Sequence, residues 1–537
     1  MEKKKRNILV IAVLLIGVVA IIGVSYALWV LNLTQQGQND IASSCFNITF
    51  TDKDNISLQK AYPILDEDGK KLTPYEFTIT NTCDSYASFN VNLEVLNTTT
   101  LTNNDAVKVM ISSKTGDTET EINTNLLSSY KTTMKTLNNA QTAFNLTTGY
   151  LNAKESKTYT LRLWLDENVD MNTKGVQNTK FSSKVVVTTS YAKEIPKSAS
   201  ETITTLVSGA NTSSTDVYTV PNKTSDSCTY TLAYDGTTDN NLRYVGANPC
   251  NYVKIDNEYW RIIGVMNNID DGTGKKETRI KLIRNESIGT YSWDSSESSV
   301  NGGYGVNEWS QADLMKLLNP GFESESVGGS LYYNNSSKNC YSSNNNGTKA
   351  CDFTSSGIKT NLKNLVGNTL WNTGSNDGVT YTYKNIITNK FYELERSSNN
   401  GKICESDSYC NDTVTRTTTW NGKVGLMYPS DYGYATSGGS TSNRTSCLNK
   451  ELYNWDSSSY SDCKNNDWLL DSIDWQWTIS PLAFSPGSYG VFGIYAVGSV
   501  DGRDARYAGL VRPSVYLISK TSILGGEGTL ENPYEIG

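Results

Sequence analysis

The chain opens with an uncharged apolar run behind a short basic segment. Residues 8–24 hold only apolar residues and glycine, and four basic residues, Lys3 to Arg6, precede them. Basic flanks stay on the cytoplasmic side of a membrane, so the rest of the chain is expected outside the cell. We predict a single-pass anchor at the cell membrane, an N-terminal transmembrane helix within residues 1–33 that contacts the membrane through residues 8–30.

The same segment has a second interpretation as a long signal peptide. Ser25, Tyr26 and Ala27 fit the small-x-small pattern of a cleavage site, so cleavage after Ala27 stays open. Both interpretations export the remainder of the chain. The length of the apolar run favours the uncleaved anchor.

Between residues 40 and 193, short runs of β-branched and aromatic residues are separated by turns rich in Gly, Asn and Asp. In residues 159–165, YTLRLWL, apolar positions alternate with polar ones, as in a strand with one buried face. The spacing of these runs predicts an all-β sandwich over residues 40–193. Residues 125–144 lack the pattern, and we expect a helix or a long connection there.

Residues 194–222 are rich in Ser, Thr, Ala and Pro. This composition is typical of a linker, although a short helical turn fits residues 200–207.

From residue 223 onward the pattern mixes strands and helices. Strand-like runs flank an Asp-Asn turn at 256–257, which suits a hairpin. Residues 307–321 carry an apolar stripe that ends at Asn-Pro-Gly and predicts a helix, and residues 355–371 predict a second, shorter one. We therefore expect an α+β domain with long loops over residues 223–537.

Charge and composition exclude several classes of function. The net charge is −8, which argues against nucleic acid as a partner. The chain contains no histidine, so histidine-based catalysis and imidazole metal ligands are ruled out. Neither a GxSxG elbow, a P-loop nor a GxGxxG dinucleotide motif in a βαβ context occurs, so we expect neither a cofactor nor an enzyme.

The ten cysteines are even in number and form no CxxC motif. In an exported chain this indicates disulfides, although free thiols are the alternative. Pairing neighbours along the chain is the simplest arrangement: Cys45–Cys83, Cys228–Cys250, Cys340–Cys351, Cys404–Cys410 and Cys447–Cys463.

The densest mixture of aromatic, Gly and charged residues lies between residues 484 and 507. Large rings with polar handles are typical of binding surfaces. The alternative is an exposed hairpin whose charges only keep it soluble. The candidate ligand-binding residues are Phe484, Tyr489, Phe492, Tyr495, Arg503, Asp504, Arg506 and Tyr507.

Three tryptophans precede this stretch. Trp468, Trp475 and Trp477 have ring faces that can stack on sugars, but the WxW pattern before TISP favours core positions for the last two. They are expected to form the floor of the site.

The acidic residues are candidates for a calcium site and for glycoside hydrolysis. Asp501, Asp504 and Glu527 can offer oxygen ligands, but neither an EPN nor a QPD tripeptide nor an EF-hand spacing accompanies them. Carboxylate pairs such as Glu393 and Glu395 are expected by chance in a chain with 55 acidic residues. We predict no metal site.

The first part of the chain resembles the TasA/camelysin-type surface proteins of Gram-positive bacteria. The basic start, the apolar run ending in SYALW, and the motifs FTITNTC, KTYTLRLWLDE and SSKVVVTTSY carry this resemblance over residues 1–193. It implies export through a dedicated signal peptidase and the capacity to form extracellular fibres.

The second part resembles a domain recurrent in surface proteins of gut Firmicutes. The motifs YWRIIGV, NEWSQADLMKLLN, GKVGLMYPSDYGYA, WTISP and GLVRPSVYL carry this resemblance. It implies a C-type-lectin-like fold, shared with formylglycine-generating enzymes and with ligand-binding proteins varied by retroelements. In the latter, a late aromatic-rich segment before a terminal strand carries the binding face.

These observations predict a membrane-anchored, adhesin-like protein that binds a glycan or protein ligand through its C-terminal domain. The first alternative is a structural subunit of a surface fibre that self-associates through the β-sandwich. The second is a carbohydrate-active enzyme.

Overall fold

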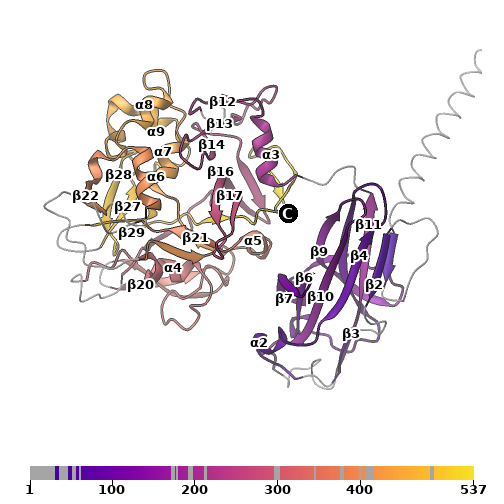
Figure 1. Cartoon of the computed structure of the whole chain (residues 1–537). Coiled ribbons are helices and arrows are strands. Elements are labelled where there is room, and N and C mark those ends of the chain that lie inside the picture. Colours follow the sequence, from indigo (N-terminus) through magenta and orange to yellow (C-terminus); the bar gives the residue numbers. More distant parts are fainter. Residues whose placement is uncertain are drawn as a thin grey trace, which may run out of the picture. The chain divides into compact units, whose positions relative to one another are not determined.

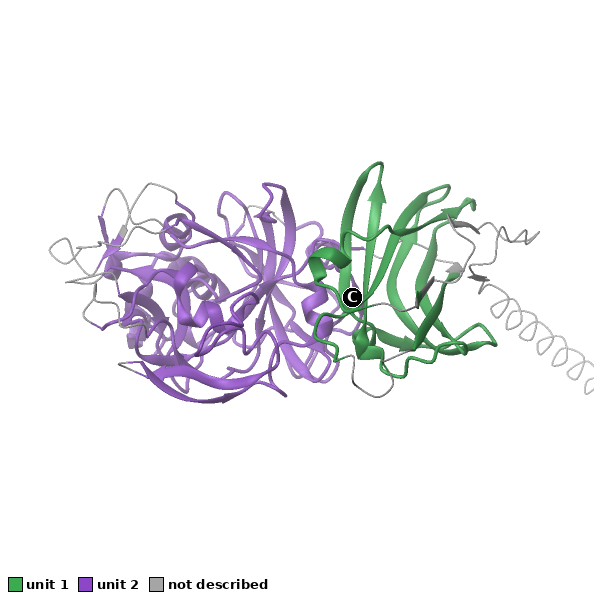
Figure 2. Cartoon of the chain, turned by 90° about the horizontal axis from the view of Figure 1, so that it is seen from below, with its two compact units in different colours: residues 1–195 green, residues 196–537 purple. Residues whose placement is uncertain are grey.

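The computed structural model divides the chain into two compact units, residues 1–195 and residues 196–537 (Figures 1 and 2). Each unit has a hydrophobic core of its own. The structure describes residues 31–34, 46–50, 56–59, 62–170, 176, 179–191, 197–210, 214–295, 303–343, 346–374, 380–397, 402–404, 417–483 and 489–537.

The predicted membrane segment, residues 8–30, lies outside the described residues. Within the described part of the chain, no helix is both long and apolar enough to cross a membrane. Residues 31–33, which we had included in the anchor, form strand β1 (Leu31–Thr34) of the first unit. The register pairs Leu31 with Thr189, so the sheet-forming part of the chain begins before residue 40.

The first unit is a β-sandwich, as predicted. One sheet has the order β1-β11-β5-β9-β8 with β3 also on β11, and the other has the order β2-β4-β10-β6-β7. Phe89 of the first sheet meets Tyr159 of the second at 6.0 Å between ring centroids, within the shared core. The remaining bounds are β2 (Phe46–Phe50), β3 (Ile56–Gln59), α2 (Asp66–Gly69), β4 (Tyr75–Asn81), β5 (Ala87–Leu96), η1 (Asn104–Ala106), β6 (Val107–Thr115), β7 (Thr118–Leu126), η2 (Leu127–Ser129), β8 (Lys131–Thr133), β9 (Ala140–Leu151), β10 (Ser156–Leu165) and β11 (Lys180–Tyr191).

The expectation of a helix or long connection over residues 125–144 was wrong. This stretch completes β7, forms η2 and β8, and begins β9. Buried Glu94 of β5 accepts hydrogen bonds from the backbone amides of Thr136 and Leu137, at 2.7 and 2.9 Å. These bonds satisfy the backbone of the turn between β8 and β9, so no helix is needed to do so.

The described part of residues 194–222, predicted as a linker, belongs to the second unit, and the helical turn predicted at residues 200–207 is confirmed by a helix at Ala199–Leu206. Helix α3 (Ala199–Leu206) places Ala199, Ile203 and Val207 in the core of that unit. Ser198 and Glu201 form a capping box at its start. The backbone amide of Ala199 donates to the carbonyl of Thr521 at 2.6 Å.

The second unit combines two sheets with short helices. The larger sheet has the order β12-β13-β14-β16-β17-β30-β25 with β15 on β16, and the smaller has the order β18-β29-β26-β27-β28. Strand β16 contains the run predicted from YWRIIGVM, and residues 260–266 are buried on both faces, as expected for an unbroken apolar run.

The strands of these two sheets are β12 (Tyr218–Thr219), β13 (Thr231–Tyr234), β14 (Leu242–Tyr244), β15 (Tyr252–Ile255), β16 (Glu258–Asp270), β17 (Lys276–Arg284), β18 (Thr290–Ser292), β25 (Val424–Gly425), β26 (Gln476–Leu482), β27 (Gly490–Ile494), β28 (Val500–Asp504), β29 (Ala508–Leu510) and β30 (Ser514–Tyr516). Two-stranded pairs are β19 (Ser337–Ser343) with β20 (Gly347–Asp352), β21 (Thr369–Asn372) with β24 (Thr419–Gly422), β22 (Thr380–Thr382) with β23 (Lys402–Cys404), and β31 (Ile523–Gly525) with β32 (Glu535–Ile536).

The helices of the unit are short. They include the two predicted ones, α4 with the preceding turn η3, and α5. The bounds are η3 (Trp309–Gln311), α4 (Asp313–Leu318), α5 (Thr360–Leu365), η4 (Tyr383–Asn385), α6 (Thr388–Arg396), α7 (Pro429–Ala435), α8 (Arg444–Leu448), η5 (Leu452–Asp456), η6 (Ser458–Tyr460) and α9 (Ser461–Asn465).

Buried charges attach α7 to the larger sheet. Asp431 of α7 accepts from Arg243 of β14 and from Lys281 of β17, each at 2.6 Å, and all three side chains are at most 1% exposed. Burial alone would raise the pKa of Asp431, but Lys281 and Arg243 hold it well below its usual range. Burial lowers the pKa of Lys281 to about 8, against the opposing effect of Asp431.

Three of the predicted disulfides are confirmed. Cys228–Cys250, Cys340–Cys351 and Cys447–Cys463 are bonded in the second unit. Cys83 and Cys404 are also disulfide-bonded. Cys45 and Cys410, their predicted partners, lie outside the described residues, so these two pairings stay predictions.

Candidate ligand-binding face

The hairpin of β27 and β28 forms one edge of the smaller sheet, and its side chains extend a continuous stack of rings and guanidinium groups. We call this stack the arginine–aromatic ladder. In spatial order it consists of Trp475, Tyr495, Arg503, Tyr507, Arg506, Tyr304 and Tyr489.

Arg503 occupies one half of the ladder. Its guanidinium carbon lies 5.4 Å from the ring centroid of Trp475, 5.3 Å from that of Tyr495 and 5.8 Å from that of Tyr507. The rings of Trp475 and Tyr495 are themselves nearly parallel, at 27° and 6.2 Å between centroids. Three rings around one cation hold its planar fork in a fixed orientation.

Arg506 occupies the other half. Its guanidinium carbon lies 4.0 Å from the Tyr304 ring centroid and 5.4 Å from that of Tyr507. Asp504 pairs with Arg506 at 3.3 Å, with both side chains less than one fifth exposed. Tyr304 in turn stacks on buried Tyr489, at 4.7 Å between centroids. The ladder therefore joins the hairpin to a segment far upstream in the sequence.

Side chains from other parts of the second unit hold the turn that closes the hairpin by hydrogen bonds. Tyr432 of α7 donates its hydroxyl to the carbonyl of Gly498 at 2.8 Å, and Lys464 donates to the carbonyl of Val497 at 2.8 Å. Within the turn, the amide of Gly498 donates to the carbonyl of Tyr495 at 2.7 Å. These bonds fix the turn, so the face needs little ordering before a ligand binds.

Partial burial shapes the electrostatics of the ladder. Burial raises the pKa of Asp504, although Arg506 and Arg503 oppose the shift. Burial also raises the pKa of Tyr495 to about 12. The Nε atoms of Arg503 and Arg506 are buried without hydrogen-bond partners among the described residues. Donors left in this state favour an incoming acceptor, because an unpaired buried polar group is costly.

The structure brings most of the predicted ligand-binding residues together. Tyr495, Arg503, Asp504, Arg506 and Tyr507 are half-buried on the ladder face.

Two of the predicted residues are buried away from that face, and a third is not described. Tyr489 is only 7% exposed and supports the ladder from behind. Phe492 was wrongly assigned, because it is fully buried and packs on Phe391 of α6 at 5.2 Å. Phe484 lies outside the described residues.

The sequence did not point to Tyr304. For Trp475 it predicted burial but not the contacts with Tyr495 and Arg503. Trp475 and Trp477 are buried, as predicted, with ring centroids 4.2 Å apart. Trp468 is also buried and donates its indole N–H to the carbonyl of Tyr244 at 3.0 Å. A tyrosine beside two glycines, as at 303–305, was the only local signal for Tyr304.

A pair of carboxyl groups, those of Asp294 and Asp313, is attached to the hairpin by a backbone hydrogen bond. The amide of Asp313 donates to Asp294 Oδ1 at 3.4 Å, and the amide of Ser295 donates to Asp313 Oδ2 at 3.1 Å. Burial, and then the nearby Asp294, raise the pKa of Asp313 to about 7. The amide of Asp294 also donates to the carbonyl of Ala505 at 3.0 Å, which attaches this pair to the hairpin.

The calcium candidates do not come together. Asp504 is paired with Arg506, whereas the amide of Glu527 donates to the carbonyl of Asn532 in the C-terminal loop. Among the described residues, no group of three or more Asp, Glu or Cys side chains is arranged to hold a metal ion.

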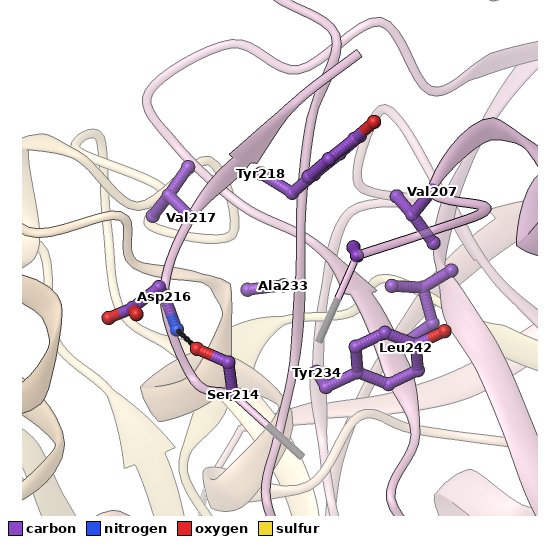
Figure 3. A pocket seen from close by; sticks show the side chains of 9 residues that line it. Val207, Ser214, Asp216, Val217, Tyr218, Ala233, Tyr234 and Leu242 are labelled. Atoms are coloured by element: carbon purple, nitrogen blue, oxygen red, sulfur yellow. Dashed lines mark hydrogen bonds between the residues drawn. The ribbon is translucent and has the colours of Figure 1, made fainter. Parts of the chain in front are cut away.

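A small hollow lies elsewhere in the second unit, where α3 meets β12, β13 and β14 (Figure 3). It encloses about 200 Å³ between the side chains of Val207, Tyr218, Tyr234 and Leu242. Asp216 lies at its margin and donates its backbone amide to the Ser214 hydroxyl at 3.1 Å. Its lining is mainly apolar, with few polar groups that could orient a ligand.

Comparison with known proteins assigns no family. No protein-family model matches the chain, and no curated protein matches it. A solved structure that matches in part is the crystal structure of the infectious bursal disease virus VP2 subviral particle, at 11% identity and a TM-score of 0.15. That match covers 30% of this chain and 33% of the viral chain, and at this TM-score it carries no argument.

Proposed function

We propose that the protein is an adhesin-like surface protein of a Gram-positive bacterium. Residues 8–30 anchor it in the cell membrane, the β-sandwich acts as a stalk, and the second unit binds a glycan or protein ligand outside the cell. The apolar run behind basic residues supports the anchor.

The observation that carries the binding role is the arginine–aromatic ladder. It gathers two arginines and half-buried tyrosine rings around a fixed hairpin, which is the composition of binding hot spots. Plain solubility would need no such stacking, because solvated charges do not have to be organised around rings. A rigid aromatic face with polar donors therefore favours recognition over a simple surface loop.

A C-type-lectin-like fold for the second unit is part of this proposal. Its support is the position of the ladder hairpin, which follows the helices and precedes strand β30 and the closing loop. The sequence motifs given above point the same way.

Self-association through the first unit is a second candidate role. Strand β7 stands at the end of its sheet, so its outer backbone groups have no strand partner in that sheet. Such an edge can pair with another chain. Glu119 and Glu121 on β7 form ion pairs within the unit, at 2.5 and 2.8 Å, which makes the edge less open to a partner.

The test of the binding role uses residues 196–537, which have their own core. This fragment is screened on arrays of glycans and extracellular proteins, beside variants Arg503→Ala and Arg506→Ala. Lys254→Ala is the matched control, because Lys254 lies 5.5 Å from the Tyr259 ring in a different sheet. Binding that both ladder variants lose and the control keeps supports the proposal.

Two other outcomes oppose it. If both ladder variants still bind, the ligand binds at another site of the second unit. Filaments formed by residues 31–195, with no binding by residues 196–537, make the structural role the better account.

A further inference from the structure

We infer that the ligand of the ladder is a sugar acid, a sugar residue of a glycan that carries a carboxylate. The inference rests on the proposed binding function and adds the chemical class of the ligand. It follows from three features of the ladder: a cation without an ion-pair partner, ring faces that are already covered, and phenol hydroxyls that remain open.

The cation is Arg503. Asp504, the nearest carboxylate in the ladder, is engaged by Arg506 at 3.3 Å. None of the ion pairs between described residues includes Arg503. The guanidinium fork, held by three rings, matches a carboxylate in bidentate geometry.

The ring faces explain why a neutral sugar is the weaker candidate. Neutral sugars bind proteins by placing an apolar ring face on an open aromatic ring. Trp475, the largest ring of the ladder, is only 8% exposed, and Tyr495, Trp477 and Arg503 cover it. Gly493 and Gly509 complete the enclosure, because a Cβ at either position would come within 2.9 Å of the Trp475 ring. The described residues of the ladder therefore offer no open tryptophan ring for stacking.

The open phenols favour a sugar over an acidic peptide as the source of the carboxylate. Tyr304 and Tyr507 are half-buried, and no hydrogen bond between described residues uses their hydroxyls. The face thus offers one cation outside any ion pair of the described residues and two hydroxyl groups along the same ladder. A ring that carries one acid group and several hydroxyls matches this set, whereas an acidic side chain brings only the acid.

Asp501 limits how much negative charge the ligand can carry. It stands two positions before Arg503 on β28, so both side chains project from the same face of the strand. Its charge disfavours a second anionic group next to the first, and the net charge of −8 repels polyanions at longer range. The ladder therefore selects a single carboxylate rather than a heavily sulfated chain.

The experiment uses the full-length chain in detergent and measures affinity by calorimetry. The probes are methyl β-D-glucuronide, the methyl glycoside of N-acetylneuraminic acid, methyl β-D-glucoside, an acetylated Glu-Glu dipeptide amide, and heparin. We expect at least one of the two sugar acids to bind at least about ten-fold more tightly than the glucoside, since hydrogen bonds to charged groups are worth that factor or more.

Variants locate the effect on the ladder. Arg503→Ala and Arg503→Lys should each lose about ten-fold or more in affinity for the sugar acid, because lysine keeps the charge but not the fork. Tyr507→Phe keeps the ring and should lose a smaller factor. Thermal unfolding of every variant separates lost binding from lost folding, and Lys254→Ala should behave as the parent chain.

The remaining outcomes decide against the inference in distinguishable ways. If the glucoside or the dipeptide binds as tightly as the sugar acids and Arg503→Ala abolishes this, the site stands but the ligand class is wrong. If heparin alone binds, a polyanion surface replaces the sugar-acid site. If no probe binds and the arrays are also empty, the proposed function fails together with the inference.

Discussion

The guanidinium carbon of Arg506 lies 4.0 Å from the ring centroid of Tyr304, and the Arg506 amide donates to the Tyr304 carbonyl at 3.3 Å. One residue thus contacts the other through both side chain and backbone. The segment before η3 and the hairpin before β29 therefore form one structural element, although most of the second unit separates them in sequence. Tyr304 links Arg506 to Tyr489, the last ring of the ladder.

Replacing Tyr304 by Ala should loosen the hairpin without unfolding the unit. The change removes a cation–π contact of about 0.5–1 kcal/mol and the stacking partner of Tyr489. Hydrogen exchange followed by mass spectrometry should show faster exchange in peptides covering residues 489–507. Tyr62→Ala, at an exposed position of the other unit, should leave these peptides unchanged. Equal exchange in the Tyr304 variant would contradict the coupling.

Replacing Phe492 by Ala should destabilise the second unit by about 3–5 kcal/mol, as for other buried aromatic residues. Phe492 is fully buried against Phe391, so its removal leaves a cavity between β27 and α6. Arg503→Ala should cost about 1 kcal/mol or less, because its contacts are half-exposed. Urea unfolding of both variants measures the difference. If the Phe492 variant is as stable as the parent, Phe492 is not a core residue and is again a candidate for ligand contact.

The pattern of β27 shows why Phe492 was misassigned. All five residues of this strand are buried, so neither face of the strand is open to solvent. Alternation along the strand therefore cannot show which side chains contact a ligand. The neighbouring β28 keeps one buried and four half-buried positions, so Arg503 and Asp504 stay predicted ligand contacts. The sequence identified the hairpin but not which of its strands is covered by helices.

Helix α3 agrees with the helical turn expected at residues 200–207, although the composition of this stretch favoured a linker. Ala199, Ile203 and Val207 follow each other at intervals of four, the spacing of a helix face, within a stretch rich in Ser and Thr. Three apolar positions are enough here because the core of the second unit supplies the rest of the contacts. Tyr304 carried no such signal, since its role depends on a partner distant in sequence.

The carboxyl pair of Asp294 and Asp313 makes stability depend on pH. Folding raises the pKa of Asp313 from 3.8 to about 7, so between these values the folded state holds a proton that the unfolded chain has lost. Stability from this group is therefore present at low pH and decreases as pH rises towards 7. The midpoint of thermal unfolding should decrease as the pH is raised from about 4 to about 7. In Asp313→Asn, whose amide can replace the protonated carboxyl as a donor, the fall should be smaller. If the midpoint decreases equally in both chains, groups other than Asp313 cause the pH dependence of stability.

Removing the disulfide Cys228–Cys250 should lower stability by about 3 kcal/mol, because it closes a loop with a sequence separation of 22. The double variant Cys228→Ser and Cys250→Ser tests this by thermal unfolding. Reducing agent should lower the midpoint of the parent chain further, since it opens the other bridges as well. A peptide map without reduction checks the pairing, and a fragment joining Cys228 to any other cysteine would contradict it.

The buried charges around Asp431 lead to a prediction about how α7 is attached. Replacing Asp431 by Asn leaves Arg243 and Lys281 buried with no shared carboxylate, which should cost about 3–5 kcal/mol. Adding Lys281→Met should recover part of this loss, because the second cation is then removed and its site is lined by the rings of Trp371, Tyr428 and Tyr516. Urea unfolding of the single and double variants measures the recovery. A double variant less stable than Asp431→Asn alone would mean that Lys281 stabilises the core through its aromatic contacts rather than through Asp431.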